Sequence, residues 1–200
     1  MRSLRTLLLT ALLSLSAVSF AQSAPAKADG PKADAQKTEA PKTEAQQAFD
    51  KLKTLAGSWV GQLTTVPAAP PVDGKMAQFS LRVTSRGNAL VHEISVSGIP
   101  DHPLTMFYLD DGRLTLTHYC DAGNRPRMVA KASPDGKTIE FDFLDLSGGN
   151  HHGHMHHAVF TFIDDNHHTE DWTFMMSADK SVRAHFDLQR TNFGSGVSGN

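Results

Sequence analysis

The sequence predicts an all-β fold: an antiparallel up-and-down β-barrel of about eight to ten strands, preceded by one short N-terminal helix. Apolar and polar residues alternate along most of the chain after residue 57, which is typical of half-buried strands. Turn sequences separate the alternating segments, for example at residues 86–88, 110–112 and 134–136. Tight turns favour hairpins between consecutive strands, and closing the sheet removes its exposed edges. An open sandwich with Greek-key connections is the alternative architecture.

One segment has helical periodicity. Thr43, followed by Gln46 three residues later, forms a capping-box pattern at its start, and Gly57 is a suitable C-terminal stop. The apolar residues that repeat at helical spacing between these limits are Ala45, Ala48, Phe49, Leu52 and Leu55. About ten strands are expected after the helix, near residues 58–66, 76–86, 89–98, 103–110, 113–120, 126–132, 138–144, 154–164, 167–177 and 181–190.

Residues 1–21 have the pattern of a signal peptide. Arg2 and Arg5 precede an apolar run from Leu7 to Val18, and small residues stand at Ser19 and Ala21, where signal peptidase reads the chain. The run is shorter than the about 20 residues that cross a bilayer, although an uncleaved membrane anchor is the alternative interpretation. We therefore expect an exported protein, periplasmic or extracellular, with no transmembrane segment after cleavage.

The remaining chain divides into three parts. Residues 22–42 are rich in Ala, Pro, Lys and Glu and are expected to form a disordered linker, since they contain too little apolar surface to fold. Residues 43–193 are expected to form the barrel domain and residues 194–200 a flexible tail. A net charge of −2 argues against a nucleic-acid partner. The single cysteine excludes an internal disulfide and Cys-rich zinc modules.

Alternation also assigns the residues that face the barrel interior. The predicted lining is mainly aromatic and aliphatic, but it includes five polar side chains: His92, His118, His154, His156 and Glu170. Buried polar groups need partners, so these five indicate a ligand's polar head, a metal ion or a hydrogen-bonded network. Of the 11 histidines, His167 and His168 are expected beside a turn and His185 on the outer face.

The first hypothesis is a non-enzymatic barrel that binds a small hydrophobic or amphipathic molecule. The aromatic residues predicted to contact the apolar body of this ligand are Phe141, Phe143, Phe160, Phe162 and Trp172. The polar residues predicted to orient its head are His92, His118, His156 and Glu170. This hypothesis requires a residual cavity inside the barrel.

The second hypothesis is a metal-binding protein or a metal-dependent enzyme. His154 and His156, two residues apart on one strand, share a face, and His118 and Glu170 add ligands from other strands. Such a set suits zinc, copper or nickel. The third hypothesis is a purely structural network of interior histidines. Cys120, two residues from His118, is a further candidate as a nucleophile, although buried thiols are usually inert.

Gly57 and Trp59 form a Gly-x-Trp motif between a short helix and the first strand, and Arg190 occupies the end of the last strand. This arrangement resembles the calycin superfamily of lipocalins, fatty-acid-binding proteins and nitrobindin-like haem-binding barrels. The resemblance implies that Arg190 stacks on Trp59 and closes one end, and that the barrel holds a small hydrophobic molecule. A haem would need an axial histidine, for which His118 and His156 are candidates.

A second resemblance is narrower. Residues 114–120 and 123–128, followed by His154-Met155-His156, are similar to a group of exported bacterial proteins of unknown function. This likeness implies export and no particular activity. Ligand, metal and oligomeric state stay open at this point.

Overall fold

The computed structural model describes residues 41–191 of the 200-residue chain. The predicted signal peptide, the tail at 194–200 and nearly all of the predicted linker lie outside the described residues. Within residues 41–191, no helix has the length and apolar content needed to cross a membrane.

The single α-helix, α1 (Glu44–Lys53), begins at the predicted cap: the Thr43 hydroxyl accepts a hydrogen bond from the Gln46 backbone N–H at 3.2 Å. The sequence pattern suggested that Gly57 stops this helix, but it does not. The helix ends three residues earlier, at a Thr54 cap in the right-handed region, and Gly57 is the first residue of β1. Gly57 adopts φ +139°, a conformation that favours glycine.

The remaining elements are antiparallel strands and one 3-10 turn, η1 (Ser85–Gly87). The strands are β1 (Gly57–Val66), β2 (Met76–Thr84), β3 (Ala89–Val96), β4 (Leu104–Asp110), β5 (Arg113–Tyr119), β6 (Arg125–Ala132), β7 (Thr138–Ser147), β8 (His154–Asp164), β9 (His167–Ser177) and β10 (Lys180–Thr191). Each strand pairs with its neighbours in sequence, and β1 pairs with β10 to close the barrel. The predicted fold class is confirmed, and the closed meander rules out the sandwich alternative.

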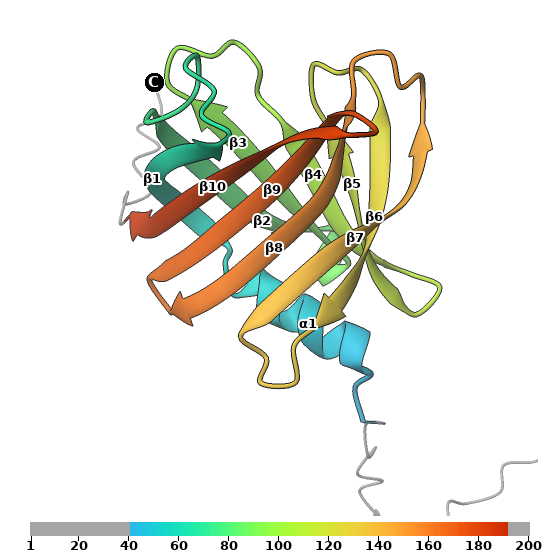
Figure 1. The fold of residues 1–200 in the computed structure, drawn as a ribbon. Helices are drawn as coiled ribbons and strands as arrows, with labels where there is room; N and C mark the ends of the chain where they lie inside the picture. Colours follow the sequence, from blue (N-terminus) through green and yellow to red (C-terminus); the bar gives the residue numbers. More distant parts are fainter. Residues whose placement is uncertain (1–40, 192–200) are drawn as a thin grey trace, which may run out of the picture. The chain divides into compact units, whose positions relative to one another are not determined.

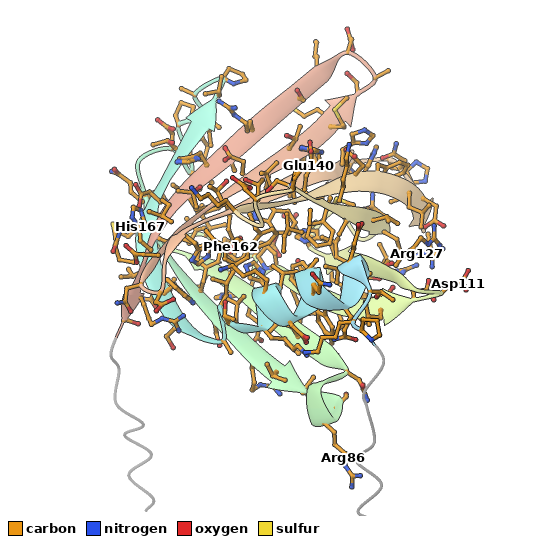
Figure 2. All side chains as sticks on the ribbon, turned by 90° about the horizontal axis from the view of Figure 1, so that it is seen from below. Arg86, Asp111, Arg127, Glu140, Phe162 and His167 are labelled. Carbon is orange, nitrogen blue, oxygen red and sulfur yellow. The ribbon has the colours of Figure 1, made fainter. Side chains whose placement is uncertain are left out.

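The two ends of the barrel differ. Helix α1 lies across one end, which we call the helix end (Figures 1 and 2), and buries Ala48, Phe49 and Leu52 in the core. Lys51 Nζ stands 4.8 Å from the centre of the Phe162 ring, so Phe162 packs under the helix. The β3–β4 and β7–β8 connections lie at the opposite end, which we call the mouth (Figure 1).

The middle of the barrel is filled by aromatic rings. Phe107, Phe141 and Phe160 are fully buried, and their ring centres lie 5.4 to 5.9 Å apart. Such edge and tilted contacts add to the stability that burial alone provides. Because these rings pack on one another, Phe141 and Phe160 belong to the core and do not line an open space there.

Arg190 joins the helix end to the last strand. Its guanidinium carbon lies 4.1 Å from the centre of the Trp59 ring, its partner across the β1–β10 ladder. The same guanidinium donates to the carbonyls of Thr54, Ala56 and Asp165 at 3.0, 2.8 and 2.9 Å. A Cβ atom at Gly57 would stand 2.7 Å from Arg190 Nη1. Glycine at this position therefore leaves room for the guanidinium.

We predict that Arg190→Ala lowers the free energy of unfolding by about 2 kcal/mol, because three carbonyls lose a charged donor and Trp59 loses its stacked cation. Urea denaturation measures this change. Arg183→Ala is the matched control on the same strand, where the exposed side chain lies 3.9 Å from Asp171, and should cost less than about 0.5 kcal/mol. Equal losses in the two variants would contradict the assigned role of Arg190.

Candidate functional site

A buried carboxylate lies at the centre of the barrel. Glu170 on β9 is fully buried, and its two carboxylate oxygens are hydrogen-bonded by three side chains. His92 Nε2 lies 3.1 Å from both oxygens, and His168 Nε2 lies 3.1 Å from Oε1. Trp172 Nε1 donates to Oε2 at 2.9 Å. A buried charge with this many partners avoids most of the cost of leaving water.

Strand geometry places these groups together. His168, Glu170 and Trp172 alternate along β9 and therefore share the inner face, whereas His92 reaches the carboxylate from β3. Burial raises the pKa of Glu170. The charge of His92 and the hydrogen bonds from His168 and His92 lower it by more, so the pKa falls to about 2. The carboxyl group is therefore ionised at neutral pH.

His168 is the member of this network that the sequence prediction placed at a turn. The structure buries it completely, with its ring 4.2 Å from that of Trp59, edge to face. The β8–β9 turn covers only residues 165 and 166, so β9 is already inside the barrel at its second residue. The signal was present, because His168 continues the alternation of Glu170 and Trp172.

His118 lies next to this network but has different contacts. His92, Thr105 and His118 are direct neighbours across β3, β4 and β5. The Thr105 hydroxyl lies 2.8 Å from His118 Nδ1, whereas His118 Nε2 is buried without a hydrogen-bond partner among the described residues. Burial, with a smaller contribution from the charge of His92, lowers the pKa of His118 to about 3. Its imidazole is neutral at physiological pH.

A cavity of about 120 Å³ opens beside His118 at the mouth. Its lining is apolar apart from His118 and one carboxyl group, and consists of Ile94, Val96, Ile99, Asp101, Pro103, His118, Met155, Trp172, Ala184 and Phe186. Of the predicted ligand-binding residues, His118 and Trp172 line this cavity. Below it the aromatic core is closed.

The wall formed by β8 differs from the predicted one because of a β-bulge. The β8–β9 register shifts between Met155 and His157, and a bulge adds one residue that breaks the alternation of faces. Met155 consequently lines the cavity and packs against the core. His154 and His156 are half-buried and contact each other, with Nε2 of the first 3.1 Å from Nδ1 of the second. Burial and the neighbouring His156 lower the pKa of His154.

Phe143, also predicted to contact the ligand, belongs to this separate pair. Its ring stacks on that of His156 with centres 4.9 Å apart, and lies equally far from His154. Of the residues predicted to bind the ligand, His118 and Trp172 line the mouth cavity. The others are the network residues His92 and Glu170, the core residues Phe141, Phe160 and Phe162, and Phe143 with His156.

The four predicted metal ligands, His118, His154, His156 and Glu170, do not gather around one point. His118 is bound to Thr105, Glu170 belongs to the central network, and the other two form their own pair. The bulge contributes to this separation, because it changes the alternation on β8 so that Met155, and neither His154 nor His156, lines the cavity beside His118.

A different group can hold a metal ion. Glu140 and Asp142 on β7 and His157 on β8 offer one ligand atom each within 4.8 Å of one another, the one such set of three or more in residues 41–191. His157 Nδ1 lies 3.1 Å from Asp142 Oδ1, and its Nε2 lies 3.3 Å from Glu140 Oε1. The group is half-buried to exposed on the outer face of the barrel. Alternation along β7 places both carboxylates on this face.

Two candidates from the sequence have ordinary environments. Cys120 is half-buried, and burial raises the pKa of its thiol, which disfavours the nucleophilic thiolate. His185 lies on the outer face as expected, with Nδ1 3.0 Å from Asp171 Oδ1.

The comparisons with known proteins support the fold alone. No protein-family model matches the chain, and no curated protein sequence matches it. Among solved structures, the chain is similar to Rv2717c from M. tuberculosis, with a TM-score of 0.54 and 13% sequence identity. The similarity covers 72% of this chain and 97% of Rv2717c. At this identity the likeness shows a shared barrel fold.

The buried neutral state of His118 predicts a specific pH dependence. The unfolded imidazole takes up a proton below its ordinary pKa of 6.5, whereas the folded one, with a pKa of about 3, does not. The unfolded state therefore binds more protons, and His118 alone should lower the free energy of unfolding by about 2 kcal/mol between pH 7 and pH 5. Urea denaturation of the wild type and His118→Gln at both pH values isolates this contribution.

Between pH 7 and pH 5, the free energy of unfolding of the wild type should fall by about 2 kcal/mol more than that of His118→Gln. His185→Gln, a surface histidine, is the control and should keep the wild-type pH dependence. A constant difference between the wild type and His118→Gln at the two pH values would contradict burial of a neutral His118.

Proposed function

We propose that this protein binds a small molecule in the mouth of its barrel and has no catalytic step of its own. The observation that carries the proposal is the apolar cavity of about 120 Å³ whose wall includes His118, a fully buried imidazole with Nδ1 already bound to Thr105. Apolar pockets with a few polar groups are the usual form of ligand sites. The Nε2 atom of His118 is the group that orients the ligand.

The proposal keeps the calycin-like assignment and the export expected from the sequence. The stacking of Arg190 on Trp59 beside Gly57 supports a calycin-like closure of the helix end. The ligand then enters through the other end. The signal-peptide pattern stays a prediction, and on that basis we propose that the site works in the periplasm or outside the cell.

Haem does not fit this site. His118 and His156 are the candidate axial ligands for a haem iron. The cavity next to His118, however, measures about 120 Å³. Pockets for drug-sized ligands measure roughly 300–1,000 Å³, and a porphyrin belongs to that size class. The half-buried His156 already stacks on Phe143.

Filling the cavity should weaken binding. Ala184 lines the cavity on β10, so we predict that Ala184→Leu occupies the space and weakens binding of benzene, used as an apolar probe, at least tenfold. Titration with benzene in ¹³C-methyl NMR spectra measures the affinity. Shifts are expected for the methyl groups of Ile94, Met155 and Ala184.

Ala178→Leu, in the exposed β9–β10 turn, is the matched control and should leave the titration unchanged. The proposed function fails if benzene shifts no mouth methyl group in the wild type, or if the two variants behave alike.

A second candidate function is supported by the group of Glu140, Asp142 and His157. One imidazole and two carboxylates within 4.8 Å of one another are ligands that zinc and other divalent transition ions accept. We propose this group, rather than His118, His154, His156 and Glu170, as the place where such an ion binds. His157 would supply one ring nitrogen as a ligand. That nitrogen would then contact the ion in place of the carboxylate that it contacts now.

We predict that His157→Ala weakens Zn²⁺ binding at least tenfold, because the ion loses its nitrogen ligand. Isothermal titration calorimetry on protein without an affinity tag measures the effect. His185→Ala is the matched control, since His185 is another surface histidine paired with a carboxylate. Unchanged binding in His157→Ala, or equal losses in both variants, would reject this metal site.

A further inference from the structure

We propose that the mouth cavity selects a molecule without negative charge that carries one hydroxyl group on an apolar body no larger than about a single aromatic ring. This inference rests on the proposed small-molecule function and adds the size, the polarity and the charge of the ligand. Each property follows from a different set of contacts at the cavity.

The size of the ligand follows from the volume and the walls. The cavity measures about 120 Å³, and Ile94, Phe186 and Met155 are among the side chains around it. An apolar protein cavity of about 150 Å³ holds one benzene molecule. The space therefore accepts one ring or a short branched chain, and its apolar walls favour a hydrocarbon body.

The hydroxyl group follows from the pairing of His118. The Thr105 hydroxyl lies 2.8 Å from His118 Nδ1 and can either donate to it or accept from it. In the first case His118 Nε2 carries the hydrogen and donates to the ligand; in the second case Nε2 accepts. A ligand hydroxyl satisfies both states, because it is a donor and an acceptor. Pairing this buried nitrogen recovers the cost of leaving it without a partner.

The absence of negative charge on the ligand follows from the surrounding groups. A carboxylate in the cavity would lie near the carboxyl group of Asp101 in the wall. Trp172, which also lines the cavity, is bound to the ionised Glu170. His118 stays neutral because its burial lowers the pKa, so it does not provide a positive charge to balance an anion. A buried ion without a partner is unfavourable.

The test compares phenol, benzene and benzoate by methyl NMR titration of the wild-type protein. Phenol should bind about tenfold more tightly than benzene, the ratio expected for one recovered buried hydrogen bond. Benzoate should bind at least tenfold more weakly than phenol. Phenol should also move the ¹⁵N signal of His118 Nε2, whereas benzene should not.

His118→Leu should reduce the preference for phenol over benzene to within twofold while benzene still binds. The ¹⁵N measurement on the wild type needs no substitution and stays decisive if this variant folds poorly. Equal affinities for phenol and benzene in the wild type, an unmoved Nε2 signal, or binding of benzoate tighter than that of phenol would overturn the inference on ligand class. Benzene binding would then still support the proposed function, whereas failure of both neutral probes would reject both.

Discussion

The interior of this barrel depends on the buried carboxylate of Glu170. Taking an ion out of water is costly, and the cost is offset only when every lone pair has a partner of good geometry. Here His92, His168 and Trp172 supply those partners from β3 and β9, with distances of 2.9 to 3.1 Å. The register of the two strands is therefore constrained by chemistry as well as by packing, because a shift of one residue would turn these groups outward.

The interior of the barrel has two regions of different character. On one side, Phe107, Phe141 and Phe160 fill the space between the strands, and Arg190 on Trp59 secures the helix end. On the other side, His118 is neutral, since burial and the nearby charge of His92 lower its pKa. The result is a cavity whose walls are apolar apart from one neutral imidazole and one carboxyl group, and it suits an uncharged ligand better than an anion.

Several features of this arrangement were predictable from the sequence, and the failures have local causes. Alternation along β9 correctly places Glu170 and Trp172 on the inner face. The same alternation extends back to His168, but its position beside the expected turn was given more weight. Alternation along β8 fails at Met155, because a bulge adds a residue without a sequence signal that distinguishes it. The expectation for His154 and His156 failed with it. The group of Glu140, Asp142 and His157 was not predicted, because it lies on the outer face and its members meet only through the pairing of β7 with β8.

By itself, the sequence determined the helix, the ten strands, the tight turns and the inward position of most core residues, since these depend on local periodicity and turn chemistry. Only the tertiary structure decided which inward groups meet. Whether His118 joins His156 or Thr105, and whether Phe160 lines a cavity or closes a core, depends on strand register, bulges and the distance across the barrel. Those quantities arise from contacts between residues far apart in sequence, such as His92 and Glu170, which no local pattern records.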